Sequence, residues 1–327
     1  MRIRFILTLV SLIVWQNMSA QTLKFHKDGS FKIVQFTDVH WKAGLPESEI
    51  AAENMNAILD AEKPDFVIYT GDVIFGSPGA QGLDRALEPV VSRGIPFAVT
   101  WGNHDDEQDM TRQEIYDYMK KKPGNLSGTV PGISGITNFI LPIESSTGKK
   151  SAFTLYGIDS GSYSKIPSIK GYDWIKHDQI HWYRENSHRI IQEHQGDTIP
   201  ALMFFHIPLP EYQQATQDQN IPMIGTRKEM VCAPEINSGM FNAILEMGDV
   251  MATFAGHDHI NDYVVLWKGI LLGYGRYSGG NTVYNNIPGG NGARVIQLKE
   301  GERSFCTYIR LRTGEILNRI QYPQDFK

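Results

Sequence analysis

Side chains of metal-binding type occur in five short clusters along the chain, and each cluster follows an apolar run. The clusters are Asp38-Val39-His40, Gly71-Asp72, Gly102-Asn103-His104-Asp105, His206 and Gly256-His257-Asp258-His259. They supply seven carboxylate, imidazole and amide ligands, namely Asp38, His40, Asp72, Asn103, His206, His257 and His259. This donor set suits zinc, manganese or iron better than calcium. Each motif alone is more often an ordinary turn or cap, but five in this order favour a metal site.

The ligand number fits a pair of metal ions. If Asp72 bridges them, each ion receives four protein ligands and a bridging solvent molecule has room to bind. A hydroxide held by two cations about 3.5–4 Å apart is suited to in-line attack on phosphorus. His104 follows the ligand Asn103 without being needed as a ligand, so it can protonate the leaving oxygen. The sequence therefore predicts a hydrolytic centre of two Mn, Fe or Zn ions, with Asp72 and His104 as its catalytic residues.

Alternating strands and helices must bring these clusters together. Apolar runs predict strands at 31–37, 66–70, 95–100, 201–205 and 250–254. Helical periodicity and length predict helices at 47–62, 83–92, 174–193 and 240–247. Each predicted strand precedes one cluster, and the carboxyl ends of strands in open α/β sheets are where ligands bind. Beyond residue 263 we expect antiparallel strands, and the turn-rich segments 124–147 and 213–234 are expected to be long surface excursions.

Composition bounds the class of protein. The chain has 327 residues, of which 41% are hydrophobic and 20% are charged, and this is typical of a globular protein. A formal net charge of −5 and the lack of long Lys/Arg runs argue against a constitutive nucleic-acid partner. Cys232 and Cys306 are the two cysteines, and the sequence allows them either to pair or to remain reduced. The composition does not indicate an oligomeric state.

Residues 1–20 have the pattern of an export signal. Arg2 and Arg4 precede the apolar stretch 5–15, and Met18-Ser19-Ala20 offers a cleavage site. The stretch is short for a membrane span. We therefore expect a mature chain of residues 21–327 in the periplasm or secreted. A retained N-terminal anchor is the alternative, and only then would the protein lie at a membrane.

The five clusters resemble the motifs of the calcineurin-like metallophosphoesterase superfamily, from Asp38 to Asp262. The resemblance implies one α/β domain over residues 21–327, a four-layer sandwich of two facing mixed β-sheets flanked by helices. It places Asp38, His40, Asp72 and His259 on one metal, and Asp72, Asn103, His206 and His257 on the other. It also makes His104 the acid. A closer similarity, which includes residues 227–237 and 292–295, is to bacterial and plant relatives of purple acid phosphatases.

The sequence departs from the purple enzymes at one ligand. Purple members carry Gly-Asp-x-x-Tyr, whose tyrosine binds iron(III), and they lack a histidine in the first motif. Here Phe75 occupies the tyrosine position and His40 is present. An imidazole thus replaces the phenolate, so we expect an intact dimetal centre without the group that gives the purple colour.

Three functions agree with this pattern. The first is an exported dimetal phosphoesterase that hydrolyses small phosphate monoesters. The second is a phosphodiesterase acting on nucleotide or lipid head-group diesters, because the same centre performs both reactions and only the pocket decides. The third is a metal-bound binding protein without turnover, and the presence of His104 and every expected ligand argues against it.

Several further side chains are candidates near such a site. Asp105 and Asp106 either orient His104 or accept loop amides. Arg227, Arg276 and Arg294 are candidates for binding the substrate phosphate, and Tyr212 for lining the entrance; a structural role is the alternative for each. His177, His181 and His188 share one helical face, which we interpret as a solvated face.

Overall fold

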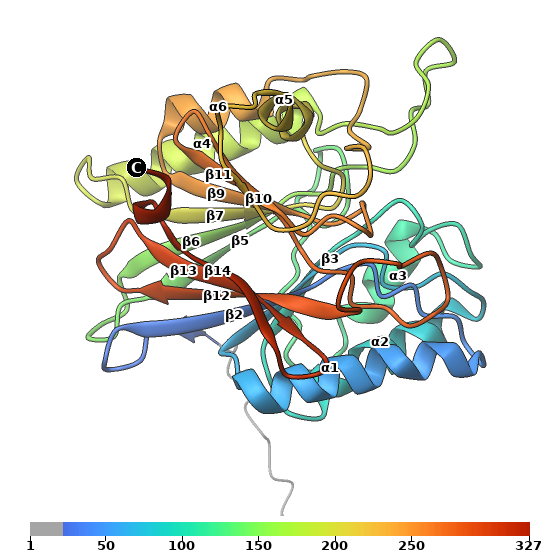
Figure 1. Ribbon diagram of the computed structural model, residues 1–327. Helices are drawn as coiled ribbons and strands as arrows, with labels where there is room; N and C mark the ends of the chain where they lie inside the picture. Colours follow the sequence, from blue (N-terminus) through green and yellow to red (C-terminus); the bar gives the residue numbers. More distant parts are fainter. Residues whose placement is uncertain (1–21) are drawn as a thin grey trace, which may run out of the picture.

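The computed structural model describes residues 22–327, and its elements form four layers (Figure 1). Two mixed β-sheets face each other, and helices cover the outer surface of each sheet. This arrangement confirms the predicted four-layer α/β sandwich. The predicted export signal at residues 1–20 lies outside the described residues.

One sheet combines early and late segments of the described chain, residues 30–100 and 292–322. Its strand order is β14-β13-β12-β2-β3-β4. The strands are β2 (Ser30–Phe36), β3 (Phe66–Thr70), β4 (Phe97–Thr100), β12 (Gly292–Lys299), β13 (Phe305–Leu311) and β14 (Ile316–Tyr322). Strands β2, β3 and β4 are parallel, whereas β12, β13 and β14 are antiparallel neighbours. Strand β12 pairs antiparallel with β2 and places Val295 opposite Val34.

The second sheet has the order β1-β5-β6-β7-β9-β11-β10-β8. The strands are β1 (Leu23–Lys24), β5 (Phe139–Glu144), β6 (Ser151–Gly157), β7 (Ala201–Phe204), β8 (Met223–Ile224), β9 (Val250–Ala255), β10 (Val264–Trp267) and β11 (Ile270–Tyr274). Its central strands β6, β7, β9 and β11 are parallel. The carboxyl ends of β7 and β9 therefore lie at one edge, as parallel strands require.

In the part of the chain that the structure describes, three α-helices cover each sheet. The helices are α1 (Glu49–Glu62), α2 (Gly79–Val91), α3 (Arg112–Met119), α4 (His177–Glu193), α5 (Pro210–Gln217) and α6 (Met240–Met247), with short 3-10 turns η1 (Pro46–Ser48) and η2 (Gln324–Phe326). The first three pack on the six-stranded sheet and the last three on the eight-stranded sheet. Val34 of β2 faces the helices, while its neighbour Ile33 faces the other sheet. This alternation explains why β2 is apolar on both faces.

The segment 124–147 is not wholly a surface excursion, contrary to the prediction. Strand β5 lies within it, and Phe139 and Ile143 are buried between the sheets. Pro142 obscured this strand because proline cannot donate a ladder hydrogen bond and usually signals a break. The segment 213–234 likewise includes the end of α5 and the short strand β8.

Other predicted elements needed smaller adjustments. Helix α2 begins at Gly79, four residues before its predicted start, and α3 was not predicted. The antiparallel strands expected beyond residue 263 are present, although β11 also pairs in parallel with β9. Among residues 22–327, no helix combines the length and the apolar character that crossing a membrane requires.

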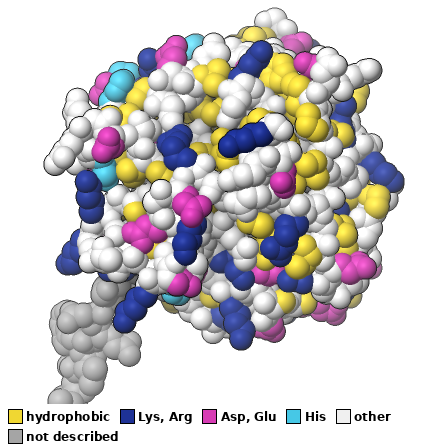
Figure 2. All heavy atoms as spheres, turned by 60° about the vertical axis from the view of Figure 1, so that its left-hand side comes forward, with side chains coloured by type: hydrophobic (Ala, Val, Ile, Leu, Met, Phe, Trp, Pro, Cys, Tyr) yellow, Lys and Arg dark blue, Asp and Glu magenta, His cyan; other side chains and the backbone are white. Residues whose placement is uncertain are grey.

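Basic and acidic side chains are interspersed on the face that Figure 2 shows, which lies on the left-hand side of Figure 1. No sign of charge dominates that face, in keeping with the small net charge of the chain. The metal-binding motifs follow the right-hand ends of the strands, away from this face.

Candidate metal centre

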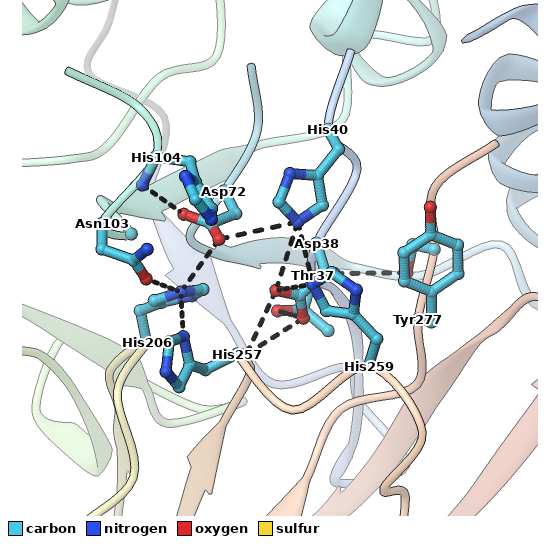
Figure 3. A network of polar contacts seen from close by, with 12 residues as sticks. Thr37, Asp38, His40, Asp72, Asn103, His104, His206, His257, His259 and Tyr277 are labelled. Atoms are coloured by element: carbon cyan, nitrogen blue, oxygen red, sulfur yellow. Dashed lines mark hydrogen bonds and ion pairs between the residues drawn. The ribbon is translucent and has the colours of Figure 1, made fainter. Parts of the chain in front are cut away.

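The seven predicted ligand residues converge between the two sheets, directly after the carboxyl ends of five strands (Figure 3). Asp38 and His40 follow β2, Asp72 follows β3, Asn103 follows β4, His206 follows β7, and His257 and His259 follow β9. Every one of the seven is at most 7% exposed. The structure therefore brings together residues that are more than 200 positions apart in the chain.

Four of these residues form one potential metal position, namely Asp38, His40, Asp72 and His259. The Nε2 atoms of His40 and His259 lie 2.9 Å apart. His40 Nε2 is 3.6 Å from Asp72 Oδ2, and His259 Nε2 is 3.7 Å from Asp38 Oδ1. Two imidazole nitrogens and two carboxylate oxygens thus point toward a common centre, as the ligands of one cation do.

A second group forms around His206. Its Nε2 atom lies 3.3 Å from Asp72 Oδ2 and 3.2 Å from Asn103 Oδ1. The same nitrogen is 3.2 Å from His257 Nδ1. These four donors match the second ligand set that the resemblance implied.

Asp72 belongs to both groups, and its two oxygens have different environments. Oδ1 accepts a hydrogen bond of 2.9 Å from the His104 amide. Oδ2 is buried and has no hydrogen-bond partner. Burial raises the pKa of Asp72, but the imidazoles of His206, His40 and His104 together hold this pKa well below its usual value. A buried carboxylate oxygen with a negative charge and no donor is costly unless a cation binds it.

Hydrogen bonds orient two of the imidazoles with Nε2 toward the centre. His206 Nδ1 donates to Thr70 O at 2.8 Å, and His259 Nδ1 donates to Tyr284 O at 2.9 Å. A carbonyl only accepts, so each Nδ1 carries a proton and each Nε2 is the nitrogen available to a metal ion. Burial lowers the pKa of His40 and of His257 well below the usual value, which favours neutral imidazoles there. Burial also lowers the pKa of His206, but the neighbouring carboxylates raise it to about 9, so a metal ion bound there displaces a proton.

The backbone of the ligand loops is strained. Four ligand residues adopt positive φ, namely Asp38 (54°), His40 (47°), Asp72 (51°) and His257 (78°). Each such residue costs of order 1–3 kcal/mol and persists only where the surroundings enforce it. The concentration of this strain in the ligand loops indicates a functional site.

Two glycines of the motifs allow the loops to approach closely. A Cβ atom on Gly102 would lie 2.1 Å from Asp72 Oδ1, and one on Gly256 would lie 2.0 Å from Thr37 Oγ1. Real Cβ atoms do not tolerate such distances, so any other residue would displace the Asp72 carboxylate or the first ligand loop.

Asp105 clamps two ligand loops together. Its carboxylate accepts hydrogen bonds from the amides of Asp72 (2.9 Å), Val73 (2.7 Å), Ile74 (3.0 Å) and Gly102 (2.7 Å). Asp105 therefore accepts loop amides, which was one of its two predicted roles, and it does not orient His104.

Glu107 is the residue that holds His104. Its Oε2 atom lies 2.5 Å from His104 Nδ1, while Asp106 instead pairs with Arg112 at 3.3 Å. Sequence reasoning missed Glu107, although its place three residues after His104 in a turn was the available signal. The His104 side chain is 28% exposed, so it faces the opening of the site, unlike the buried ligands.

Two further residues support the centre and were not predicted. Tyr163 Oη accepts a hydrogen bond of 2.9 Å from Asn103 Nδ2, which directs the amide oxygen toward His206. Arg112 donates to the backbone oxygens of Gly102 (2.6 Å) and Gly161 (2.9 Å) and thereby ties two loops together.

The other candidates have structural roles. Arg276 pairs with Asp262 and Arg294 donates to backbone oxygens, and both guanidinium groups are buried. Tyr212 is also buried, and its hydroxyl donates to Thr253 O, so it does not line the entrance.

Exposed side chains account for the remaining candidates. Arg227 is exposed, and so are His177, His181 and His188, as interpreted for that face of α4.

Cys232 and Cys306 are both free thiols.

The departure from the purple enzymes is visible in the packing. The Phe75 ring centre lies 5.4 Å from that of His40 and 4.6 Å from that of His104. Phe75 thus packs beside the imidazole that was predicted to replace the phenolate, and it offers no oxygen to a metal.

Comparison with known proteins places this geometry in a family. Residues 31–261 match the family model described as calcineurin-like phosphoesterase. The chain belongs to this family. Because its donor cluster has two halves that share Asp72, the family and the cluster together imply a dinuclear metal centre.

Two curated relatives differ in what their names say. The chain is 35% identical to an Arabidopsis thaliana protein named "Probable inactive purple acid phosphatase 14", over 88% of this chain and 79% of the relative. It is 34% identical to the Saccharomyces cerevisiae protein named "Phosphatase DCR2", over 89% of this chain and 55% of that relative. Both matches extend over nearly the whole of this chain.

Solved structures support the fold. A dimetal phosphatase from Danio rerio aligns with a TM-score of 0.62 at 13% identity, over 89% of this chain and 98% of that chain. A purple acid phosphatase from yellow lupin aligns with a TM-score of 0.55 at 12% identity, over 91% of this chain and 54% of that chain. At these identities the likeness concerns the fold alone.

Proposed function

We propose that this protein hydrolyses phosphate monoesters with two transition-metal ions, Mn, Fe or Zn, bound on either side of Asp72. The observation that carries the proposal is the buried, unpartnered Asp72 Oδ2, which lies among donors of both ligand groups. When bound, such a pair of ions activates water and neutralises the phosphate oxygens. The donor set fits these ions because it combines imidazole nitrogens with carboxylate and amide oxygens.

His104 is the proposed general acid. Its amide donates to Asp72 Oδ1 and its Nδ1 atom is held by Glu107, so Nε2 remains free for the substrate. From this position it donates its proton to the leaving oxygen as the ester bond to phosphorus breaks. Glu107 acts through His104, by fixing the ring, and is a positioning residue.

The names of the relatives disagree on whether proteins of this kind catalyse hydrolysis. The Arabidopsis relative is named as probably inactive and the yeast relative as a phosphatase. Support for turnover in this chain comes from the complete ligand set and from the His104–Glu107 pair. The alternatives are hydrolysis of diesters and metal binding without turnover.

One experiment separates these three functions. The protein is stripped of metal with a chelator and reloaded with Mn, Fe or Zn in turn. Bound metal is counted, and hydrolysis of phenyl phosphate is compared with that of diphenyl phosphate. We expect about two metal equivalents and faster hydrolysis of the monoester. Faster hydrolysis of the diester would favour the phosphodiesterase, and no turnover with both ions bound would favour the binding protein.

We also propose that the protein is exported to the periplasm or secreted, with no nucleic-acid partner. The support is the sequence pattern of residues 1–20, with Ala20 before the expected cleavage site. N-terminal sequencing of protein from its native host tests this proposal. A chain that begins at Gln21 is expected, and an intact Met1 on soluble cytoplasmic protein would refute export.

A further inference from the structure

Aromatic rings surround the metal centre on several sides. The Tyr172 ring centre lies 4.2 Å from that of His257, and the Tyr284 ring stacks on His259 at 4.3 Å. Phe75 packs against His104, as described above, and the Tyr163 hydroxyl contacts Asn103. We call Phe75, Tyr163, Tyr172 and Tyr284 the aromatic collar.

The collar is not part of the core of the fold. Its three tyrosines belong to none of the three apolar clusters that hold the layers together. Tyr163 is 40% exposed and Tyr284 is 57% exposed. Tyr163 stacks on Tyr172 at 5.7 Å, within the loop that projects between β6 and α4 (Figure 1). Large rings that remain accessible beside a reactive centre are available to a ligand.

Other exposed apolar side chains lie on the same loops. The described chain exposes eight large hydrophobic side chains. Five of them lie on loops next to the metal ligands or the collar, namely Leu45, Tyr163, Ile166, Met230 and Tyr284. These loops therefore carry most of the exposed large hydrophobic side chains of the described residues.

Side chains of both charge signs lie near the collar. The Glu229 carboxylate accepts a hydrogen bond of 3.1 Å from Tyr284. Lys42 keeps its positive charge 4.6 Å from the Phe75 ring centre, where its Nζ donates to Thr282 O. Lys165 and Lys170 are exposed on the loop that carries Tyr163 and Tyr172. Because the charges are mixed, the rings are the feature that can select the leaving group.

We propose that the aromatic collar binds the leaving group, and that the substrates are phosphate monoesters of phenols. This inference rests on the proposed hydrolysis. In the reaction, water adds its oxygen to phosphorus, the bond from phosphorus to the phenolic oxygen breaks, and His104 supplies the proton that this oxygen takes up. The collar stacks on the ring of the phenol and places its oxygen toward His104.

Binding of two phosphonates that cannot be hydrolysed tests the collar separately from turnover. In benzylphosphonate and heptylphosphonate a CH₂ group replaces the ester oxygen, and the two have equal numbers of carbon atoms. Calorimetry on the metal-loaded protein should show tighter binding of benzylphosphonate. Tyr284→Leu should reduce that advantage about 2–10-fold, the size of a lost ring-stacking contact, with unchanged metal content. Tyr284→Phe should retain the advantage, because it keeps the ring.

Further variants keep the test decisive. Tyr172→Leu serves the same purpose if Tyr284→Leu fails to fold. Leu245→Ala is the control, since Leu245 is 40% exposed on α6, outside these loops, and its loss should leave the benzyl preference intact. Equal affinity for the two phosphonates, or a Tyr284→Leu effect of equal size on both, would overturn the proposal.

A protein that prefers benzylphosphonate yet hydrolyses no ester would retain the collar and refute the proposed function.

Discussion

The two carboxylate oxygens of Asp72 make different contacts. One oxygen holds the amide of His104, and the other lies between the two groups of metal ligands. The residue therefore links both groups of candidate ligands to the proposed general acid.

Replacement of the bridging carboxylate should remove both metals. Loss of a residue that merely supports a ligand weakens metal binding about 10–100-fold. Asp72→Ala removes a donor from both positions, so metal affinity should fall by more than about 100-fold and turnover with it. Metal analysis after gel filtration measures the loss. The exposed His181→Ala is the control, and retention of both ions in Asp72→Ala would refute the bridging role.

Replacement of the general acid should leave the metals in place. His104→Asn is expected to lower turnover about 10²–10⁴-fold with unchanged metal content. The loss should shrink for 4-nitrophenyl phosphate, whose leaving group needs little protonation, relative to phenyl phosphate. A parallel fall in metal content and turnover would show instead that His104 is a ligand.

The iron-loaded protein should be colourless or faintly coloured. The purple colour requires charge transfer from a tyrosinate to iron(III), and Phe75 has no oxygen to donate. The absorption spectrum of oxidised, iron-quantified protein checks this. A strong visible band would identify another phenolate at the metal, and Tyr163, bonded to Asn103, would then be the first tyrosine to replace.

The ligand residues were predictable because their types follow apolar runs, but their supporting residues were not. Asp105, Asp106 and Glu107 are three successive carboxylates with three different partners: loop amides, Arg112 and His104. Which side chain faces which partner depends on the geometry of one turn. Three successive acidic residues in a sequence do not specify that geometry.

Asp105 holds the loops at the strand ends through four amide hydrogen bonds. Asp105→Ala would leave four buried amides without an acceptor, and each unsatisfied group costs about 1–3 kcal/mol. We expect a loss of several kcal/mol in unfolding free energy, together with metal affinity about 10–100-fold weaker. Denaturant unfolding and metal titration measure the two effects. Unchanged metal affinity in a destabilised Asp105→Ala protein would show that the clamp supports only the fold.

The strands that carry ligands were the easiest elements to predict. Strand β3 was predicted at its observed bounds, since five successive apolar or β-branched residues precede Gly71. Strand β5 was missed because of Pro142, and α3 because its eight residues bury only Ile115 and Met119. Short elements with a narrow apolar face give little periodic signal.

Metal removal should lower the stability of the whole molecule. The ligands come from loops of both sheets, so ions that bind only the folded chain stabilise it. At free metal 1,000 times above the dissociation constant this contribution is about 4 kcal/mol. Calorimetric melting with and without a chelator checks the effect. Equal melting temperatures would mean that the ions do not link the two sheets.

The order of strands in the two sheets was not predictable from patterns alone. Periodicity indicates that β2 and β12 are strands, but nothing in either segment specifies the other as its partner across some 260 residues. The two facing sheets were predicted only from the resemblance of the motifs, because the fold of the resembling family already includes this strand pairing.

The pairing of β12 with β2 also means that the six-stranded sheet cannot be completed until the end of synthesis. During synthesis β2 is among the first strands made, and the partner for one of its edges is not available until residues 292–299 have been added. Until then the strand directly before Asp38 has an open edge that can pair with another chain. Chains that terminate before residue 292 should therefore aggregate. The last tenth of the polypeptide thus determines whether the first metal-binding loop reaches its folded conformation.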